Sequence, residues 1–329
     1  MKKRVLSGMR PTGRLHLGNY LGAAKGMLAL QDDPDYETLF TVVDIHATTT
    51  PYDAKTLQQS ARDVFIDYLS IGLDPEKSAI NIQSDLADVI TQLSFYVSSV
   101  MTVARMQHLP TFKDKVKQHP DNVTMALLNY PLLMAADILI YKASKVPVGI
   151  DQEPHLEVAR EVARKMNEQF GMDFPEPTRF ATKGEYVPSL LGEGKMSKSV
   201  EGSSIELNDD LDTIVAKLKK APTDAGTGAA VPTSGGVANL FQFVELFQGE
   251  AKRREYEAAY TGSGVRYGDL KKELAQAIFD ELRPIQKKRA ELEANPDYVD
   301  RIIKEGADRS RVIAEATVAE VREKMGLRK

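Results

Sequence analysis

The first half of the chain alternates short apolar runs with longer amphipathic segments. The apolar runs are rich in β-branched residues and are bounded by turn residues, which predicts buried strands at residues 4–8, 38–44, 79–83 and 145–150. Residues 55–71 and 86–101 lie between them and have the spacing of helices. This alternation predicts an α/β fold with a Rossmann-type doubly wound parallel sheet.

The second half has a different pattern, because strand signals stop at about Leu207. Helical spacing or helix-forming composition continues at residues 212–220, 240–248, 269–294 and 298–325, with glycine-rich loops at 225–236 and 262–268. A length of 329 residues suggests two domains. We therefore predict a Rossmann-type domain at residues 1–200 and a helical domain at residues 201–329.

Composition narrows the possible functions. Hydrophobic residues make up 42% of the chain and charged residues 27%, and no apolar run approaches the ~20 residues that span a bilayer. The basic N-terminus is not followed by an apolar segment, so we expect no signal peptide and a cytoplasmic location. The chain has no cysteine, which excludes disulfides, thiolate metal sites and iron–sulfur clusters. With a net charge of −4, any RNA contact must come from a local basic patch.

A first candidate phosphate site lies at residues 12–20, TGRLHLGNY, between the first predicted strand and a helical pattern at 20–30. Free N–H groups at a helix N-terminus bind anions, and Gly13 and Gly18 let the backbone approach a phosphate closely. His16 and Asn19 add hydrogen-bond donors. The alternative interpretation is a turn that carries a surface histidine.

A second candidate phosphate site is the sequence GKMSKS at residues 194–199. Lys195 and Lys198 are three residues apart, a spacing that suits a loop holding a polyphosphate as it leaves. By itself such a string is equally typical of a solvated basic loop.

Together, the two sites resemble the paired signature motifs of class I aminoacyl-tRNA synthetases in order and in approximate separation. The resemblance narrows to bacterial tryptophanyl-tRNA synthetases, and Asn19 supports this because tyrosyl enzymes usually carry His there. It spans almost the whole chain, in the blocks LSGMRPTG (6–13), VDIHA (43–47), YPLLMAADILIY (130–141), VPVGIDQEPHLEVAREVARKMN (146–167), LRPIQKKRAEL (282–292) and the tail 305–327.

The resemblance implies tryptophan, ATP with Mg²⁺ and tRNA(Trp) as substrates, and a homodimer. It also implies that the Rossmann domain at residues 1–200 is catalytic and that the helical domain at residues 201–329 binds the anticodon. It implies catalytic roles for His16, Asn19, Lys115, Lys195 and Lys198. The residues it places at ATP are Arg10, Thr12, Gly13, His16, Gly18, Asn19, Gly149, Asp151, Lys195, Met196, Ser197, Lys198 and Ser199. No carboxylate cluster in the sequence predicts a metal site made by protein ligands alone.

The predicted amino-acid pocket centres on Asp137. In a helix, Tyr130, Met134, Asp137 and Ile138 share one face, and an acidic group among such apolar residues needs a partner. By resemblance, Asp137 accepts the indole N–H, although a structural carboxylate between helices is the alternative. The tryptophan-binding residues implied by the resemblance are Leu6, Gly8, His46, Tyr130, Met134, Asp137, Ile138, Val146, Val148 and Gln152.

Two positions depart from the common pattern of this family. Arg10 stands where many relatives have Gln, and Ile150 replaces a frequent Glu.

Three rival functions also have to be weighed: a tyrosyl-tRNA synthetase, a small-molecule nucleotidyltransferase and a catalytically silent paralogue. Tyrosyl pockets commonly have a Tyr at the position of Leu6, and a phenol hydroxyl facing Leu6 would lose a partner at a cost of roughly 1–3 kcal/mol. The 129 residues after Val200 argue against the nucleotidyltransferase.

Overall fold

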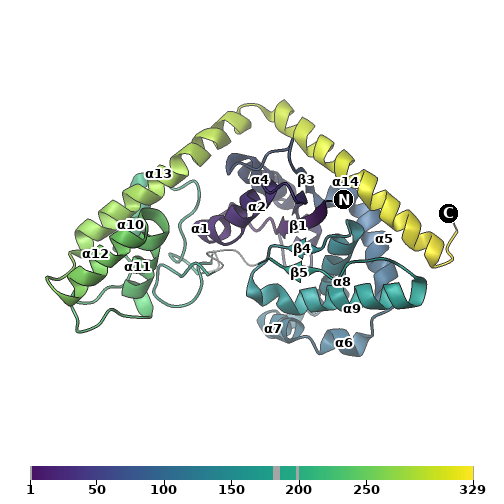
Figure 1. Ribbon diagram of the computed structural model, residues 1–329, viewed down its shortest axis with the longest axis horizontal. Helices are drawn as coiled ribbons and strands as arrows, with labels where there is room; N and C mark the ends of the chain where they lie inside the picture. The colour runs from purple at the N-terminus through teal and green to yellow at the C-terminus, as the bar shows by residue number, and fades with distance from the viewer. Residues whose placement is uncertain (1, 181–185, 198–199, 329) are drawn as a thin grey trace. The chain divides into compact units, whose positions relative to one another are not determined.

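The computed structural model describes residues 2–180, 186–197 and 200–328 (Figure 1). The chain forms two compact units: unit 1 comprises Met1–Arg14, Ala23–Lys183 and Leu292–Lys329, and unit 2 comprises Leu15–Gly22 and Gly184–Glu291. These units differ from the predicted division at residue 200. The difference arises because the segment with the first phosphate motif packs within unit 2, whereas the last helix packs within unit 1.

Unit 1 is built on a parallel five-stranded sheet in the order β3-β2-β1-β4-β5, as the α/β pattern predicts. Its strands are β1 (Lys3–Met9), β2 (Tyr36–Val42), β3 (Ala79–Ile82), β4 (Lys145–Val146) and β5 (Thr178–Arg179). The strand predicted at 145–150 is only two residues long, because Pro147 has no N–H for the ladder. The short strand β5 was not predicted.

The sheet is built outward from β1 in two opposite directions, with β2 and β3 on one side and β4 and β5 on the other. Lys3 of β1 pairs with Tyr36 of β2 on one side, and Val5 pairs with Lys145 of β4 on the other. Ligands of open α/β sheets bind beyond the carboxyl ends of the strands at such a reversal. The residues that follow β1 and β4 therefore lie where a substrate is expected.

The helices of unit 1 that precede the last one are α2 (Lys25–Gln31), α3 (Asp44–Ala47), α4 (Leu57–Ser70), α5 (Ala87–Ser98), α6 (Val103–Gln107), α7 (Pro110–Gln118), α8 (Met125–Ile140) and α9 (Glu153–Phe170). Short 3₁₀ turns lie at Gln83–Leu86, Pro120–Asn122 and Ile150–Gln152. The apolar core gathers buried side chains of α5, α8 and α9. Helix α9 begins with Pro154 in its first turn and ends at Gly171, whose left-handed conformation (φ 66°) favours glycine.

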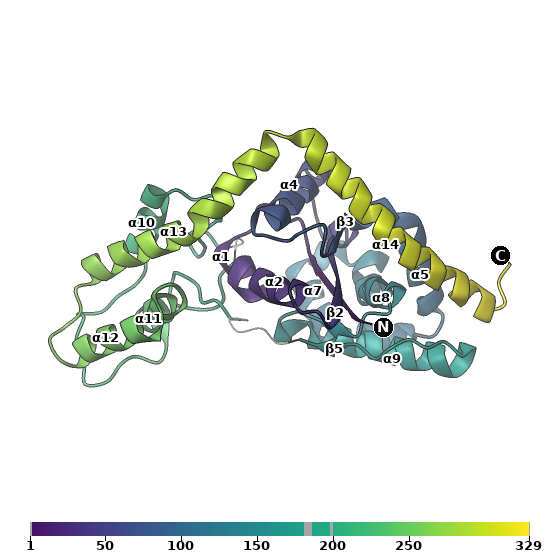
Figure 2. The ribbon, with the colours of Figure 1, turned by 45° about the horizontal axis from the view of Figure 1, so that its top comes forward.

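Helix α14 (Pro296–Lys324) packs within unit 1, whereas the predicted helical domain at residues 201–329 includes it. It lies against β3 and α5 (Figure 2). Gly306 makes the approach possible, because a Cβ at that position would stand 1.7 Å from the carbonyl oxygen of Ile80. Asn81 Nδ2 donates to Ser310 Oγ at 2.7 Å, and Arg311 Nη1 donates to Asp88 Oδ2 at 2.8 Å.

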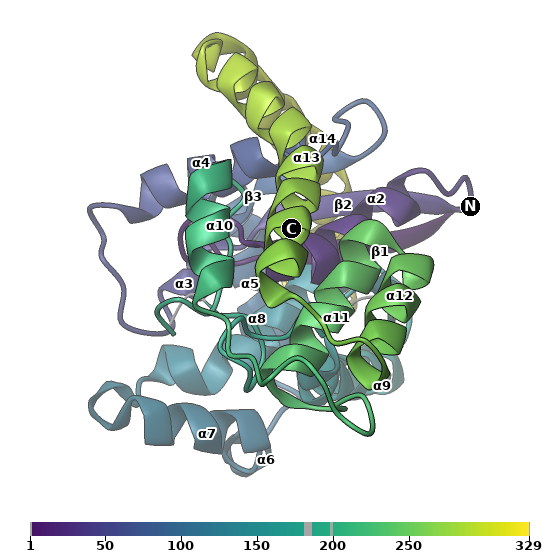
Figure 3. The same cartoon turned by 90° about the vertical axis from the view of Figure 1, so that its left-hand side faces the viewer.

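Unit 2 contains α1 (Leu17–Asn19), α10 (Leu211–Lys219), α11 (Gly235–Gln248), α12 (Glu250–Thr261) and most of α13 (Tyr267–Glu293), and a π-helical turn at Tyr20–Ala24 follows α1. Helices α11 and α12 pack on each other (Figure 3). Helix α12 was not predicted, since its charges spread around the helix and leave little apolar periodicity. None of the helices in the described parts of the chain is both long and apolar enough to cross a membrane.

Candidate active site

The carboxylate predicted to bind the indole lies on α8 and is buried, with 6% of Asp137 exposed. His46 Nε2 on α3 lies 2.8 Å from Asp137 Oδ2, and Gln83 Nε2 donates to Oδ1 at 2.7 Å. The partner that the sequence required is therefore present, as a link between α3, α8 and the end of β3. A carboxylate has about four acceptor sites, so Asp137 still has capacity for one more donor.

The predicted apolar walls of the pocket belong to the core of unit 1. Five of the predicted tryptophan-binding residues belong to one hydrophobic cluster: Leu6, Met134, Ile138, Val146 and Val148. They come from β1, from helix α8 and from the segment that begins with β4. Strands β1 and β4 are neighbours in the sheet. Ser7 Oγ also donates to the carbonyl oxygen of Pro147 at 3.2 Å, which ties these two segments together. Gly8 keeps the end of β1 close to β2, because a Cβ there would lie 2.8 Å from Val43 Cγ1.

Tyr130 and Gln152, the two predicted ammonium-binding residues, are joined through His155, which the sequence analysis did not identify. The Tyr130 hydroxyl lies 2.6 Å from His155 Nε2, and Gln152 Oε1 lies 3.0 Å from His155 Nδ1. The signal that was available is the spacing of Gln152 and His155, three residues apart at a helix N-terminus. Gln152 Nε2 also donates to Asp151 Oδ2 at 2.6 Å.

Arg10 and Lys115 of unit 1 have no acidic partner among the residues that the structure describes. Arg10 Nη2 donates to Thr50 Oγ1 at 2.9 Å, while its buried Nε has no acceptor. Lys115 Nζ donates to Gln118 Oε1 at 2.9 Å, and neither cation forms an ion pair with a described residue. Burial lowers the pKa of both groups, and the charge of Arg10 lowers the pKa of Lys115 further. An anionic ligand would relieve both costs.

In unit 2, the first phosphate motif forms a compact capping box around α1. His16 Nδ1 accepts from the Gly18 N–H at 3.0 Å, and Asn19 Oδ1 accepts from the His16 N–H at 3.1 Å. Because Nδ1 is an acceptor, the neutral imidazole carries its proton on Nε2. Gly18 is required here, since a Cβ would lie 2.7 Å from the His16 ring.

The second phosphate motif lies against the first. A Cβ on Gly18 would be 3.4 Å from Met196 Cβ, and the Leu17 N–H donates to the Ile205 carbonyl at 2.9 Å. Met196 is 2% exposed and its N–H donates to the Val187 carbonyl at 2.9 Å, whereas the Lys195 side chain is exposed. Ser203 Oγ bonds to the backbone of Ser197. Lys198 and Ser199 lie outside the described residues.

The other predicted ATP residues lie on exposed or partly exposed backbone. Thr12 and Gly13 follow β1, and Gly13 has φ 95°. Gly149 precedes the 3₁₀ turn that holds Asp151 and Gln152. Among the described residues, no group of three or more acidic or histidine side chains is arranged to hold a metal ion.

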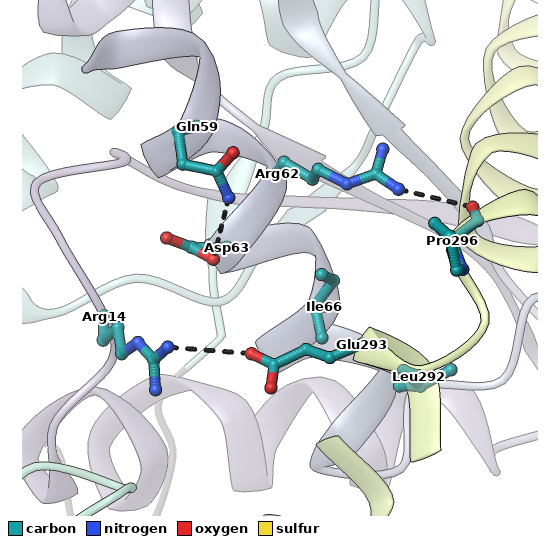
Figure 4. A pocket seen from close by; sticks show the side chains of 8 residues that line it. All are labelled: Arg14, Gln59, Arg62, Asp63, Ile66, Leu292, Glu293 and Pro296. Atoms are coloured by element: carbon teal, nitrogen blue, oxygen red, sulfur yellow. Dashed lines mark hydrogen bonds and ion pairs between the residues drawn. The ribbon is translucent and has the colours of Figure 1, made fainter. Parts of the chain in front are cut away.

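A cavity of about 370 Å³ in unit 1 contains none of the predicted site residues. Figure 4 shows its lining of paired polar groups, with Arg14 Nη2 3.6 Å from Glu293 Oε1 and Gln59 donating to Asp63 at 3.3 Å. Arg62 donates to the Pro296 carbonyl at 3.3 Å. This cavity lacks the apolar walls that an indole requires.

Comparison with known proteins places these features in one family. The family model for tRNA synthetases class I (W and Y) matches residues 1–283. This chain belongs to that family. A tryptophan–tRNA ligase of Porphyromonas gingivalis is 42% identical over 330 residues, covering 98% of this chain and 99% of the relative. A similar ligase of Helicobacter pylori is 41% identical, covering 99% of each.

The solved structures agree with this membership of the class I tRNA synthetases. The tryptophanyl-tRNA synthetase of Campylobacter jejuni, complexed with ADP and tryptophan, matches with a TM-score of 0.86 and 31% identity over 98% of this chain and 100% of that chain. The prediction of a class I synthetase fold is therefore confirmed. The roles of individual site residues stay predictions.

Proposed function

We propose that this chain is a tryptophan–tRNA ligase: it activates tryptophan with ATP as tryptophanyl-adenylate, releases pyrophosphate, and transfers the tryptophanyl group to tRNA(Trp). The observation that carries the proposal is the similarity to tryptophan–tRNA ligases over almost the full length of both chains. The position of Leu6 in the apolar cluster supports tryptophan over tyrosine, because it offers a phenol hydroxyl no partner.

In the proposed pocket the indole lies among Leu6, Met134 and Ile138, and Asp137 accepts its N–H. His46 and Gln83 hold the carboxylate in place, so that little reorganisation accompanies binding. The apolar walls also exclude water from the N–H···O bond, which strengthens it.

The first chemical step is attack of the tryptophan carboxylate oxygen on the α-phosphorus of ATP, with cleavage of the bond to the β-phosphate. The nucleophile is already ionised, so no general base is needed, and catalysis depends on positioning and charge stabilisation. We assign charge stabilisation to His16, through Nε2–H, and to Lys195 and Lys198. Arg10 and Lys115, which have no acidic partner among the described residues, supply further positive charge in unit 1.

Mg²⁺ is proposed to arrive with ATP. Because the described residues offer no group of three or more metal ligands, its coordination would come mainly from phosphate oxygens and water. The ion would neutralise phosphate charge, while the residues of this chain orient the reacting groups.

We further propose that the helical part of unit 2 binds the anticodon region of the tRNA. In α13, Arg283, Lys287 and Lys288 are exposed, whereas Arg289 is buried. Three exposed cations form the kind of local patch that a chain of net charge −4 needs for phosphate contacts. Neutralising all three should weaken tRNA binding and flatten its salt dependence without changing tryptophan activation.

The proposed location is the cytoplasm, and the proposed assembly is a homodimer. Phe95 (76% exposed), Val103 (59%) and Met125 (67%) lie on α5, α6 and α8, which pack on one another. Exposed apolar side chains of this size are typical of interaction surfaces. Light scattering of the wild type and of Phe95→Glu tests the homodimer, which predicts a dimer that the charged variant weakens.

Exchange of pyrophosphate into ATP, measured with each of the twenty amino acids, tests the central proposal. We expect exchange that requires tryptophan and Mg²⁺ and does not require tRNA. Stronger exchange with tyrosine would assign the chain to the other specificity of its family. Exchange with no amino acid would indicate a silent paralogue or a different nucleotidyl acceptor.

A further inference from the structure

His155 lies at the centre of a buried hydrogen-bond network in unit 1. It is 3% exposed, near the N-terminus of α9, and its ring meets the Tyr130 ring edge-on with centroids 5.0 Å apart. Its Nε2 lies 2.6 Å from the Tyr130 hydroxyl and 2.9 Å from Thr111 Oγ1, while Nδ1 lies 3.0 Å from Gln152 Oε1. The side chain therefore contacts both predicted ammonium-binding residues at once.

The chemistry of its neighbours fixes the protonation of this histidine. Burial lowers its pKa to about 4; the carboxylate of Asp151 acts in the opposite direction and His46 in the same direction. The imidazole is therefore neutral at pH 7 and has one donor and one acceptor nitrogen.

The orientation of the Gln152 amide decides which ring nitrogen of His155 is the donor. Asp151 Oδ2 can only accept, so the Gln152 amide nitrogen faces it and Oε1 faces His155. Nδ1 must then donate to Gln152 Oε1, which leaves Nε2 as the acceptor.

A neutral His155 in this tautomer determines what Tyr130 offers to a ligand. The only hydroxyl proton of Tyr130 points to His155 Nε2, so the remaining positions on the phenol oxygen can only accept. Gln152 Oε1 keeps a second lone pair as well. Two acceptors with fixed direction are suited to a group that only donates, such as an ammonium ion.

We propose that His155 is a positioning residue that fixes the Tyr130 hydroxyl and the Gln152 carbonyl as acceptors for the α-ammonium group of the amino-acid substrate. This inference rests on the proposed function, because it takes tryptophan as the ligand of the pocket. Without His155, the Tyr130 hydroxyl is free to rotate and direct its own proton toward the ammonium, which is repulsive. His155 itself does not touch the substrate.

The test compares two ligands, L-tryptophan and indole-3-propionate, which differ at the α-ammonium group. The chain has no tryptophan residue, so indole fluorescence comes from the ligand alone. His155→Phe keeps a ring and removes both nitrogens. His155→Gln keeps a polar group that can accept from Tyr130. Val158→Ala, at another fully buried position of α9, is the matched control for loss of packing.

We expect His155→Phe to weaken tryptophan binding about tenfold or more, the scale for hydrogen bonds to a charged group, and to leave indole-3-propionate within about twofold. His155→Gln should recover part of the loss. Val158→Ala should lower the melting temperature and leave the ratio of the two affinities unchanged.

A double-mutant cycle adds a second criterion. Tyr130→Phe should produce its own loss of tryptophan affinity, and combining it with His155→Phe should add little, because His155 acts partly through the Tyr130 hydroxyl. Equal weakening of both ligands by His155→Phe, or fully additive losses, would overturn the positioning role. If the wild type does not bind tryptophan at all, the proposed function itself fails, and this result is distinct from either outcome.

Discussion

In unit 1 the polar side chains of the predicted amino-acid pocket bond to one another beneath the surface. In unit 2, by contrast, each hydrogen bond described above for the predicted phosphate motifs involves a backbone group, and Lys195 is exposed. Asp137, Gln83 and His46 form one buried group, and His155 links Tyr130 to Gln152. Around Met196, by contrast, the fixed parts are backbone amides and carbonyls.

This difference matches two kinds of recognition. Selecting one amino acid by an N–H and an ammonium group requires donors and acceptors in fixed positions, and burial supplies them at a cost in desolvation. Stabilising a leaving polyphosphate requires positive charge that can follow the phosphates, and a long exposed lysine supplies it. Substitutions near Lys195 should therefore change mainly the rate of adenylate formation, whereas substitutions in the predicted amino-acid pocket should change mainly ligand affinity.

The largest expected effect is in the phosphate region. Lys195→Ala should slow adenylate formation by about 10²–10³-fold, the scale for removing one charge-stabilising donor. Tryptophan affinity without ATP should barely change, because the role proposed for Lys195 is contact with the polyphosphate. Lys220→Ala, at another exposed lysine of unit 2, is the control for a general loss of charge. Equal loss of tryptophan binding would mean that the loop supports the fold instead.

The second expected effect is a pH dependence of stability. His155 has a pKa of about 4 in the folded protein and about 6.5 when unfolded, so the unfolded state binds more protons between these values. The free energy of unfolding should fall by up to about 3 kcal/mol from this group as the pH decreases from 6.5 to 4. Urea denaturation at pH 7 and pH 5 should show a smaller decrease for His155→Gln than for the wild type, and equal decreases would contradict the assignment.

The third effect tests Asp137. Asp137→Ala leaves the indole N–H without a partner, which should cost on the order of 1–3 kcal/mol, or up to about 150-fold in tryptophan affinity, with ATP binding retained. The variant should also discriminate poorly against an analogue whose indole N–H is replaced by sulfur.

The contacts of Asp137 with His46 and Gln83 mean that this variant should also be less stable. Asp44→Ala is therefore the control, since Asp44 is a buried carboxylate that accepts from the Ser84 N–H. A destabilised Asp137→Ala that still selects against the sulfur analogue would restrict Asp137 to a structural role.

The smallest effect concerns Arg10. Arg10→Gln removes an unpaired, largely buried cation beside Lys115, so the ligand-free protein should become slightly more stable. Tryptophan affinity should decrease about tenfold, while tryptophanol, which lacks the carboxylate, should be affected much less. Arg14→Gln is the control, because Arg14 pairs with Glu293. If neither ligand loses affinity in the absence of ATP, the anion contact of Arg10 lies at ATP instead, and equal losses for both ligands would contradict a carboxylate contact.

Several features of the molecule were predictable because their causes are local. Alternating apolar runs predicted β1, β2 and β3 to within about two residues, since a buried strand needs a continuous apolar stretch. The two candidate phosphate motifs were visible as sequence, and in the structure a Cβ on Gly18 would lie 3.4 Å from Met196 Cβ. The missing cysteines alone excluded an iron–sulfur cluster.

Other features depended on contacts between segments far apart in the chain, which no local pattern encodes. The amphipathic helix α14 was correctly predicted as a helix, but only the close approach of Gly306 to Ile80 shows that it packs on β3. Gln83 became a partner of Asp137, and His155 a link between Tyr130 and Gln152, because the fold brings together the ends of strands and helices 54 and 25 residues apart. The sequence by itself determined the elements and the chemistry of the motifs; the tertiary structure decided which polar groups meet, because only folding takes them out of water together.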